Sequence, residues 1–433
     1  MTIRTRTARR ATTGGTAALA ALALVLPTTA SAAPDRPEEH GIPGSVSAAQ
    51  DETALREQVR HAARTAQQQV RLKGTPPGRS TPATDALDAG MAKVVTDGAI
   101  GVTVRVDSPD LTWRGSAGGR ALDKRPPAGW QDRFRVASNT KMMVATLVLQ
   151  QVEAGTWTLD TRVEDVIPGL LPDHPDVTLR QLLSHTSGMP NGTQELLLPN
   201  VEGPEMSDFL AAIGRDYTDQ DHVDAVNAFP WTEPGEFVYS NAGYVVLGML
   251  LAARTGEDVG TLLREGVWGP AGMRHTSYPL DPGMPNPALE EDAWVGDGWL
   301  ELGGFDPDLF RSSGAVVSTT ADLNAFTDAL ISGELVDPAL VQEMVTPVTT
   351  DMLQYGLGVY RLPDPCSSPE DPQWLYGHDG ATYGTLSVAF TSADGTRQLS
   401  LGVTGRDLSS LEGRWNINEV LVPALLATCP VSG

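Results

Sequence analysis

The chain has 433 residues, of which 41% are hydrophobic, and its 44 Gly and 32 Pro are typical of an ordinary folded protein rather than of low-complexity sequence. Its formal net charge is −23. So large an acidic excess excludes binding to nucleic acid or anionic lipid through bulk electrostatics. No stretch has the roughly 18 apolar residues of a spanning helix, so we expect no membrane insertion.

The first 32 residues have the pattern of a secretory signal peptide. Four arginines lie within the first ten residues, and an apolar run over 17–26 and the triplet Ala30-Ser31-Ala32 follow. This order is that of an n-region, an h-region and a cleavage site. We therefore expect residues 1–32 to be removed and the mature protein to be secreted, either free outside the cell or associated with the cell wall. The doublet Arg9-Arg10 leaves a twin-arginine export route open.

Residues 33–83 are interpreted as an N-terminal arm and linker. Residues 33–50 are rich in Pro, Gly, Ser and charge, residues 51–72 have helical composition without a breaker, and residues 74–82 read as a linker. The pattern predicts a mobile arm with one helix that can lie on the folded body.

The folded body, residues 84–429, begins and ends with sheet-forming sequence. A helix over 85–97 precedes strands over 100–106 and 111–117. Near the other end, strands over 386–391 and 398–403 flank Asp394-Gly395, which is a strong hairpin signal. A final helix is predicted over 411–426.

Between these ends lie about 200 residues of mainly helical pattern. The arrangement predicts an α+β fold in which an antiparallel sheet, built from both chain ends and flanked by helices, stands beside a mainly helical second lobe. The sheet lobe would comprise 84–135 and 350–429, and the helical lobe 136–349. We expect the active site in the cleft between the lobes.

Ser138 and Lys141 open the most apolar helix of the mature chain. Residues three apart at a helix start share a face, so the Lys side chain can reach the Ser hydroxyl. Burial of this helix would favour a neutral amine, which can activate a serine that is otherwise a poor nucleophile. The alternative is a helix-capping Ser138 and a surface Lys141.

The use of lysine in this chain favours the catalytic interpretation. The mature chain has only four lysines, and Lys141 alone has Ser three residues before it. A protein that otherwise uses Arg for positive charge keeps one Lys at this position. Arginine cannot give up its proton, whereas lysine can.

Two further segments are candidates for the same site. Tyr239-Ser240-Asn241 precedes an apolar helix over 242–252, and a Tyr beside a cationic Lys can become a phenolate that accepts the serine proton. Residues 377–384 form a glycine-rich segment around His378, whose glycines allow close backbone approach to a substrate. Alone, Tyr239 is also consistent with a core aromatic, and His378 with a turn.

The two cysteines of the chain, Cys366 and Cys429, are too few for a Cys-based zinc site. In an exported protein a single disulfide is the first interpretation, with two free buried thiols as the alternative. The chain has no His-Glu-x-x-His pair, and its acidic stretch over 290–308 has no calcium-loop motif. We expect no metal ion and no cofactor.

In order, Ser138-x-x-Lys141, Tyr239-x-Asn241 and His378-x-Gly380 resemble the three active-site motifs of the penicillin-recognising serine hydrolases, the family of D-alanyl-D-alanine carboxypeptidases and class C beta-lactamases. The loop over 182–190, which contains His185, is also similar to this family's sequence; we expect His185 to brace that loop rather than to react.

The resemblance implies a role for each matching residue. Ser138 would be the acylated nucleophile, Lys141 and Tyr239 the proton-transfer pair, and Asn241 a hydrogen-bond partner of the substrate amide. Substrate would also meet the residues of the third motif, His378, Asp379, Gly380 and Ala381. The backbone amides of Ser138 and Ala381 would form the oxyanion hole. In secreted carboxypeptidases of this type, a disulfide occurs at positions like those of Cys366 and Cys429.

Two positions depart from the carboxypeptidase pattern. Carboxypeptidases of this type hold the substrate's terminal carboxylate with Thr and Arg, where this chain has Asp379 and Tyr360. The neighbouring Arg361 would face the other side of a regular strand. Asp379 would repel a carboxylate and suit a neutral or cationic group.

The main functional expectation is a secreted serine hydrolase that acts through an acyl-enzyme as a D-alanyl-D-alanine carboxypeptidase on cell-wall peptides. The alternatives on the same fold are a beta-lactamase, an esterase and a D-amino-acid amidase or peptidase. A non-catalytic penicillin-binding module is a further alternative. We expect a small peptide or beta-lactam-like substrate and a monomeric protein.

Overall fold

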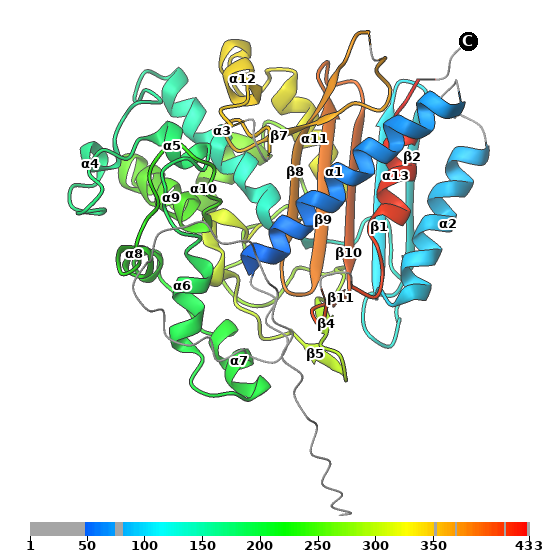
Figure 1. Cartoon of the computed structure of the whole chain (residues 1–433), viewed down its shortest axis with the longest axis horizontal. Helices are drawn as coiled ribbons and strands as arrows, with labels where there is room; N and C mark the ends of the chain where they lie inside the picture. The colour runs from blue at the N-terminus through cyan, green and yellow to red at the C-terminus, as the bar shows by residue number, and fades with distance from the viewer. Residues whose placement is uncertain (1–47, 74–80, 350–352, 369, 411–412, 431–433) are drawn as a thin grey trace, which may run out of the picture. The chain divides into compact units, whose positions relative to one another are not determined.

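The computed structural model describes residues 48–73, 81–349, 353–368, 370–410 and 413–430, shown in Figure 1. All of them belong to a single unit spanning 41–433. The predicted signal peptide, residues 1–32, and most of the predicted linker lie outside the described residues. Within the described part of the chain, no helix has both the length and the apolar character needed to cross a bilayer.

A six-stranded antiparallel sheet joins the two ends of the folded body, with strand order β2-β1-β10-β9-β8-β7. Val102 of β1 pairs with Val403 of β10, which places sequence from both ends side by side (Figure 1). The α+β prediction is thereby confirmed. The strands of this sheet are β1 Gly101–Ser108, β2 Leu111–Gly118, β7 Tyr360–Pro363, β8 Trp374–Ala381, β9 Thr385–Ser392 and β10 Gln398–Thr404.

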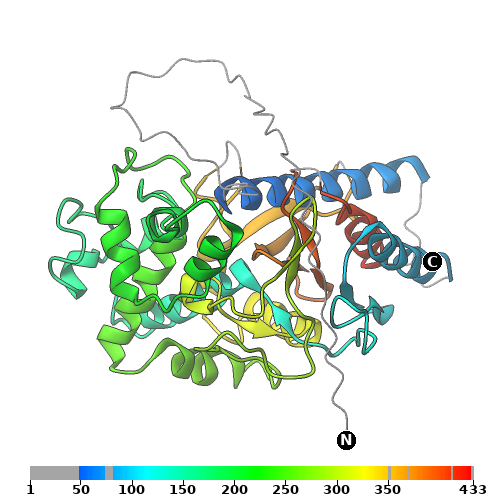
Figure 2. The same ribbon diagram turned by 90° about the horizontal axis from the view of Figure 1, so that it is seen from below.

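Alternating apolar residues direct the central strands toward helices on one face of the sheet. In β1, Val102, Val104 and Val106 are buried in the same apolar cluster as residues of α1 (Ala48–Lys73), α2 (Thr81–Asp97) and α13 (Asn418–Ala427). The helix α11 (Thr320–Ile331) contacts β1, β9 and β10. Figure 2 shows the blue and red helices on one side of the sheet and the yellow α11 on the other.

The helical part of the fold surrounds α3 (Thr140–Glu153), which is buried from Thr140 through Leu149. This burial agrees with the prediction for the apolar helix that begins near Ser138. The other helices of this part are α4 Val163–Val166, α5 Leu179–Leu183, α6 Thr193–Leu197, α7 Met206–Ile213, α8 Asp219–Asn227, α9 Asn241–Thr255, α10 Val259–Leu263 and α12 Pro338–Val345. Two small sheets complete the fold, made of β3 Phe134–Arg135 with β6 Val317–Ser318, and of β4 Asp292–Trp294 with β5 Trp299–Glu301 and β11 Arg406–Asp407.

The predicted start of the last helix is wrong. The helix was expected from residue 411, yet α13 begins at Asn418. Gly413 has φ +66°, a left-handed conformation that a right-handed helix cannot contain, and the side chain of Asn416 accepts a hydrogen bond from the backbone N–H of Asn418. These local interactions replace the first turns of the expected helix.

Candidate active site

Ser138 lies in a one-turn 3-10 helix, Ala137–Asn139, that leads directly into α3. Its neighbour Ala137 has φ +48°, a left-handed conformation that non-glycine residues rarely adopt. Such backbone strain persists only where the surrounding structure holds it, and it is common at active sites. Here it turns the chain sharply just before the predicted nucleophile.

Lys141 points back from the first turn of α3 to Ser138. Its Nζ donates hydrogen bonds to Ser138 Oγ at 3.1 Å, to Asn241 Oδ1 at 2.6 Å and to the backbone oxygen of Ser313 at 2.9 Å. The side chain is fully buried. The alternative of a surface Lys141 is therefore excluded, and an amine lies within proton-transfer distance of the serine hydroxyl.

Asn241 is the first residue of α9, and a separate part of the chain fixes its side chain. Its Nδ2 donates to Thr193 Oγ1 at 3.1 Å, and its backbone N–H donates to the backbone oxygen of Asn191 at 2.8 Å. Asn191, Thr193 and Ser313 were not among the predicted site residues. A signal existed for the first two, because they directly follow the family-like loop over 182–190.

His185, which was expected to brace its own loop over 182–190, instead joins that loop to the segment that carries Tyr239. The backbone N–H of Ser240 donates to His185 Nδ1 at 3.1 Å, and that of Val238 donates to the His185 backbone oxygen at 2.8 Å. Burial lowers the pKa of His185 well below 6.5, and the positive charges of Lys141 and Arg56 lower it further. The imidazole is therefore neutral near pH 7 and serves as an acceptor.

Tyr239 lies between His185 and Lys141. Its half-buried ring lies 4.2 Å from the ring of His185, and Lys141 Nζ is 4.8 Å from the ring centre. Lys141 Nζ thus lies over the ring of Tyr239, although 98 positions separate the two residues in sequence.

The third motif occupies the end of β8. Tyr355 Oη donates to His378 Nε2 at 3.1 Å, and His378 Nδ1 donates to the backbone oxygen of Asp379. Burial lowers the pKa of His378 well below 6.5, and the charges of Arg56 and Lys141 add to this effect. His378 is therefore neutral and fixed as one tautomer.

Gly380 allows β8 to approach the segment that carries Ser138. A Cβ at this position would lie 2.3 Å from the backbone oxygen of Val136 and 3.0 Å from Ala137 Cβ. Only glycine fits at that separation. The close approach brings the next residue of β8, Ala381, toward the Ser138 turn, so the two segments predicted to form the oxyanion hole are packed together.

Asp379 is buried within the same strand. Its carboxylate accepts a hydrogen bond from Tyr360 Oη at 2.6 Å. Arg361 faces away, as predicted: its Nε donates to Gln354 Oε1 at 2.6 Å and its guanidinium stacks 4.0 Å over the ring of Trp374. The two departures from the carboxypeptidase pattern, Asp379 and Tyr360, therefore contact each other.

Arg56 of α1, which was not among the predicted site residues, lies beside Asp379 and Tyr239. Arg56 Nε lies 3.8 Å from Asp379 Oδ1, and the guanidinium carbon lies 3.6 Å from the centre of the Tyr239 ring. The helix itself was expected, but nothing in its composition shows which of its residues meets the site.

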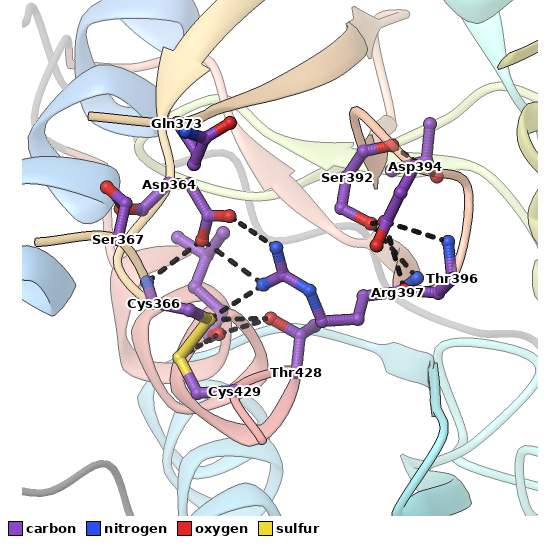
Figure 3. A network of polar contacts seen from close by, with 12 residues as sticks. Asp364, Cys366, Ser367, Gln373, Ser392, Asp394, Thr396, Arg397, Thr428 and Cys429 are labelled. Carbon is purple, nitrogen blue, oxygen red and sulfur yellow. Dashed lines mark hydrogen bonds and ion pairs between the residues drawn. A yellow bond between two sulfur atoms is a disulfide. The ribbon is translucent and has the colours of Figure 1, made fainter. Parts of the chain in front are cut away.

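The predicted disulfide is present between Cys366 and Cys429 (Figure 3). It ties the connection between β7 and β8 to the segment after α13. Arg397 donates to the buried carboxylate of Asp364 and, at 2.8 Å, to the sulfur of Cys366. Among the described residues, no group of three or more His, Cys, Asp or Glu is placed to hold a metal ion.

Comparison with known proteins gives one family. The profile of the family described as Beta-lactamase matches residues 81–403. A provisionally named penicillin-binding protein of Bacillus subtilis, PbpX, is 28% identical over 241 residues, which is 53% of this chain and 54% of the relative. A provisionally named D-alanyl-D-alanine carboxypeptidase of Escherichia coli is 26% identical over 300 residues, 59% of this chain and 65% of the relative. The chain thus spans about half to two thirds of the length of these curated relatives.

Among solved structures, a D-stereospecific amidohydrolase from Streptomyces sp. is similar over 78% of this chain and 97% of its own, with a TM-score of 0.67 and 27% sequence identity. The profile match covers more than half of the chain, and the structural match extends over both the sheet and the helices. The chain belongs to the beta-lactamase family and has its serine beta-lactamase and transpeptidase fold.

Proposed function

We propose that the protein is a serine amidohydrolase that cleaves an amide bond next to a D-residue in small peptides or amino-acid amides, through an acyl-enzyme on Ser138. One observation carries the proposal: the buried Nζ of Lys141 lies 3.1 Å from Ser138 Oγ and is held there by Asn241 and Ser313. A serine hydroxyl with a fixed amine beside it is the arrangement that nucleophilic catalysis requires.

The proposed reaction has two steps. Ser138 Oγ attacks the substrate carbonyl while its proton passes to the Lys141 and Tyr239 pair, and the backbone amides of Ser138 and Ala381 stabilise the oxyanion. The same pair returns the proton to the leaving amine as the carbon–nitrogen bond breaks. Water then attacks the ester on Ser138, which releases the acid and restores the hydroxyl.

The carboxylate of Asp379 supports an amide or amine substrate over one with a terminal carboxylate. It lies within β8, one residue from Gly380, where the carboxypeptidase pattern would have a Thr. A carboxylate there repels a second carboxylate and attracts a cation. The similarity to the Streptomyces D-stereospecific amidohydrolase supports the same substrate class.

A D-alanyl-D-alanine carboxypeptidase acting on cell-wall peptides is the second candidate. Arg56 favours it, because a guanidinium 3.8 Å from Asp379 offsets that residue's charge and could itself hold a carboxylate. The names of several curated relatives point the same way.

Turnover of matched substrates separates the two candidates. D-phenylalanine amide, its L-enantiomer and N-acetyl-D-Ala-D-Ala are offered to the wild type and to Ser138→Ala. We expect cleavage of the D-amide by the wild type only and weak cleavage of the dipeptide. Efficient cleavage of the dipeptide, lost in Ser138→Ala and unimproved in Asp379→Thr, would establish the carboxypeptidase instead.

Export is part of the proposal, supported by the arginines, apolar run and small-residue triplet of residues 1–32. A disulfide is in keeping with an oxidising compartment outside the cytoplasm. We propose that the protein acts there as a monomer.

A further inference from the structure

The helix α1 passes in front of the sheet (Figure 1). One charged side chain of this helix, Arg56, lies beside Asp379 in the candidate active site. The helix contacts β8, β7, α13 and α6. Arg56 is only 6% exposed, and its guanidinium lies between the carboxylate of Asp379 and the ring of Tyr239.

An apolar stripe, rather than Arg56, attaches α1 to the body. Leu55, Val59, Ala62 and Ala66 recur at helical spacing and are all buried in the cluster that contains residues of α13 and β8. Because the stripe does not include the arginine, the helix can stay in place when the Arg56 side chain rotates. Arg56 is therefore a separable part of the contact.

The groups that surround the Arg56 guanidinium have the chemistry of a cation site. A carboxylate supplies charge, and the face of a tyrosine ring attracts a cation stacked 3.6 Å from its centre. Tyr360 Oη donates to the same carboxylate and so orients it. These groups lie beside the proposed catalytic residues, since Tyr239 contacts Lys141 and Asp379 is two residues before Ala381.

We propose that Asp379 and the ring of Tyr239 form a subsite for a cationic group of the substrate, and that Arg56 occupies this subsite in the resting protein as an internal competitor. The expected ligand is a primary ammonium close to the scissile amide, as in a D-amino-acid amide. The proposal rests on the amidohydrolase function and specifies its substrate further.

A competitor within the chain lowers apparent affinity in proportion to the fraction of molecules in which the subsite is open. If Arg56 leaves the subsite open in about a tenth of the molecules, its removal lowers KM about tenfold. A substrate without an ammonium cannot fill the subsite, so removal of Arg56 should change its KM little.

The test compares Arg56→Gln with Arg64→Gln in the full chain. Arg64 is exposed on the same helix and provides a matched loss of one charge. KM and kcat are measured for D-phenylalanine amide, which carries an ammonium, and for N-acetyl-D-phenylalanine amide, which does not. We expect Arg56→Gln to lower KM about tenfold for the first substrate and at most about twofold for the second, with kcat unchanged. Arg64→Gln should behave as the wild type.

Two results would overturn the proposal. A higher KM in Arg56→Gln would show that the arginine helps to bind substrate. An equal decrease in KM for both substrates would show that the arginine only covers the site. Thermal unfolding checks that the variant is folded. If Arg56→Gln is unstable, Asp379→Asn is used instead. In that variant the preference for the free ammonium, measured as the ratio of the KM values of the two substrates, must fall to near unity. An unchanged ratio refutes the subsite.

Failure of the amidohydrolase function is distinguished by acylation with a D-phenylalanine p-nitrophenyl ester. If Ser138 is acylated while the ammonium preference is insensitive to Arg56 and Asp379, the subsite alone is refuted. If Ser138 is not acylated, the amidohydrolase and the subsite proposed on it fall together.

Discussion

Lys141 Nζ lies 2.6 Å from Asn241 Oδ1, a contact that joins the start of α3 to the start of α9 across 100 positions of sequence. Both side chains are buried. An amide oxygen so close to Nζ fixes the direction of the lysine side chain, and the lysine in turn reaches Ser138. The first two motifs thus form one hydrogen-bonded unit.

Replacing Lys141 by Arg should abolish most turnover. The guanidinium keeps the positive charge but does not release a proton, so it cannot act in proton transfer. We expect kcat to fall at least ~100-fold, in the range for loss of a general base. Steady-state kinetics with D-phenylalanine amide measures the loss, and a kcat within a few fold of the wild type would show that the lysine only supplies charge.

Thr193→Val should impair catalysis through Asn241. The change removes the oxygen that accepts from Asn241 Nδ2 at 3.1 Å but keeps the shape of the side chain. We expect kcat to fall several-fold with little change in KM, and a cost of about 1 kcal/mol in the free energy of unfolding. Thr193→Ser, which keeps the hydroxyl, should restore kcat. A purely structural role would lower stability and leave kcat unchanged in both variants.

Gly380→Ala should separate β8 from the Ser138 turn. The new methyl group would lie 2.3 Å from the oxygen of Val136, so the strand must shift. We expect a loss of about 1–3 kcal/mol in stability and a larger fractional loss of kcat. Gly283→Ala is the control, because nothing lies within 4 Å of a Cβ there. Equal behaviour of the two variants in urea unfolding and in turnover would refute the close approach.

His222 should make stability depend on pH. Burial lowers its pKa from 6.5 to about 4. Its Nε2 donates to the backbone oxygen of Asp308. A proton on the buried Nδ1 would lack a hydrogen-bond partner in the described structure. Between pH 4 and pH 6.5 the unfolded chain therefore binds more protons than the folded chain. The stability of the fold consequently falls as the pH falls below 6.5.

Urea unfolding of the wild type and of His222→Gln at pH 6.5 and near pH 5 measures this effect. We expect the drop in unfolding free energy over that interval to be about 1.5 kcal/mol smaller in the variant. The comparison cancels the contributions of the acidic residues, whose titration is common to both proteins. Identical drops would show that His222 is not neutral in the folded state.

The disulfide should stabilise the fold substantially. It closes a loop of 63 positions, for which the loop-entropy estimate is about 4 kcal/mol. Unfolding of the double variant Cys366→Ser, Cys429→Ser in urea, without reductant, gives the cost. No measurable loss of stability would mean that the Arg397 to Asp364 ion pair and the packing of α13 hold this end of the chain without it.

Much of the sheet and the central residues of the site could be predicted from sequence. The alternating residues of β1 and β10 and the Asp394-Gly395 turn are local signals, and the separation of Ser138 and Lys141 needs only helix geometry. The contact between these two side chains follows from their spacing of three residues at the start of a helix. Tyr239, Asn241 and His378 needed the family resemblance, since each is weak evidence alone.

The remainder depends on long-range packing that leaves no local signal. The Ser313 oxygen that accepts from Lys141 is a backbone group, which every residue possesses. Arg56 meets Asp379 across 323 positions, and helical composition does not reveal where a helix docks. The early start predicted for α13 failed because Gly413 and Asn416 adopt a local turn in place of helix.

The decisive measurement for Ser138 as the acylated nucleophile is the intact mass of the protein after brief exposure to a D-phenylalanine p-nitrophenyl ester, with Ser138→Ala treated in parallel. An activated ester forms the acyl-enzyme even where the natural leaving group is unknown. We expect the wild type alone to gain the mass of one phenylalanyl group, located on the peptide that contains Ser138. The same adduct on Ser138→Ala, or the absence of both adduct and p-nitrophenol release in the wild type, would contradict it.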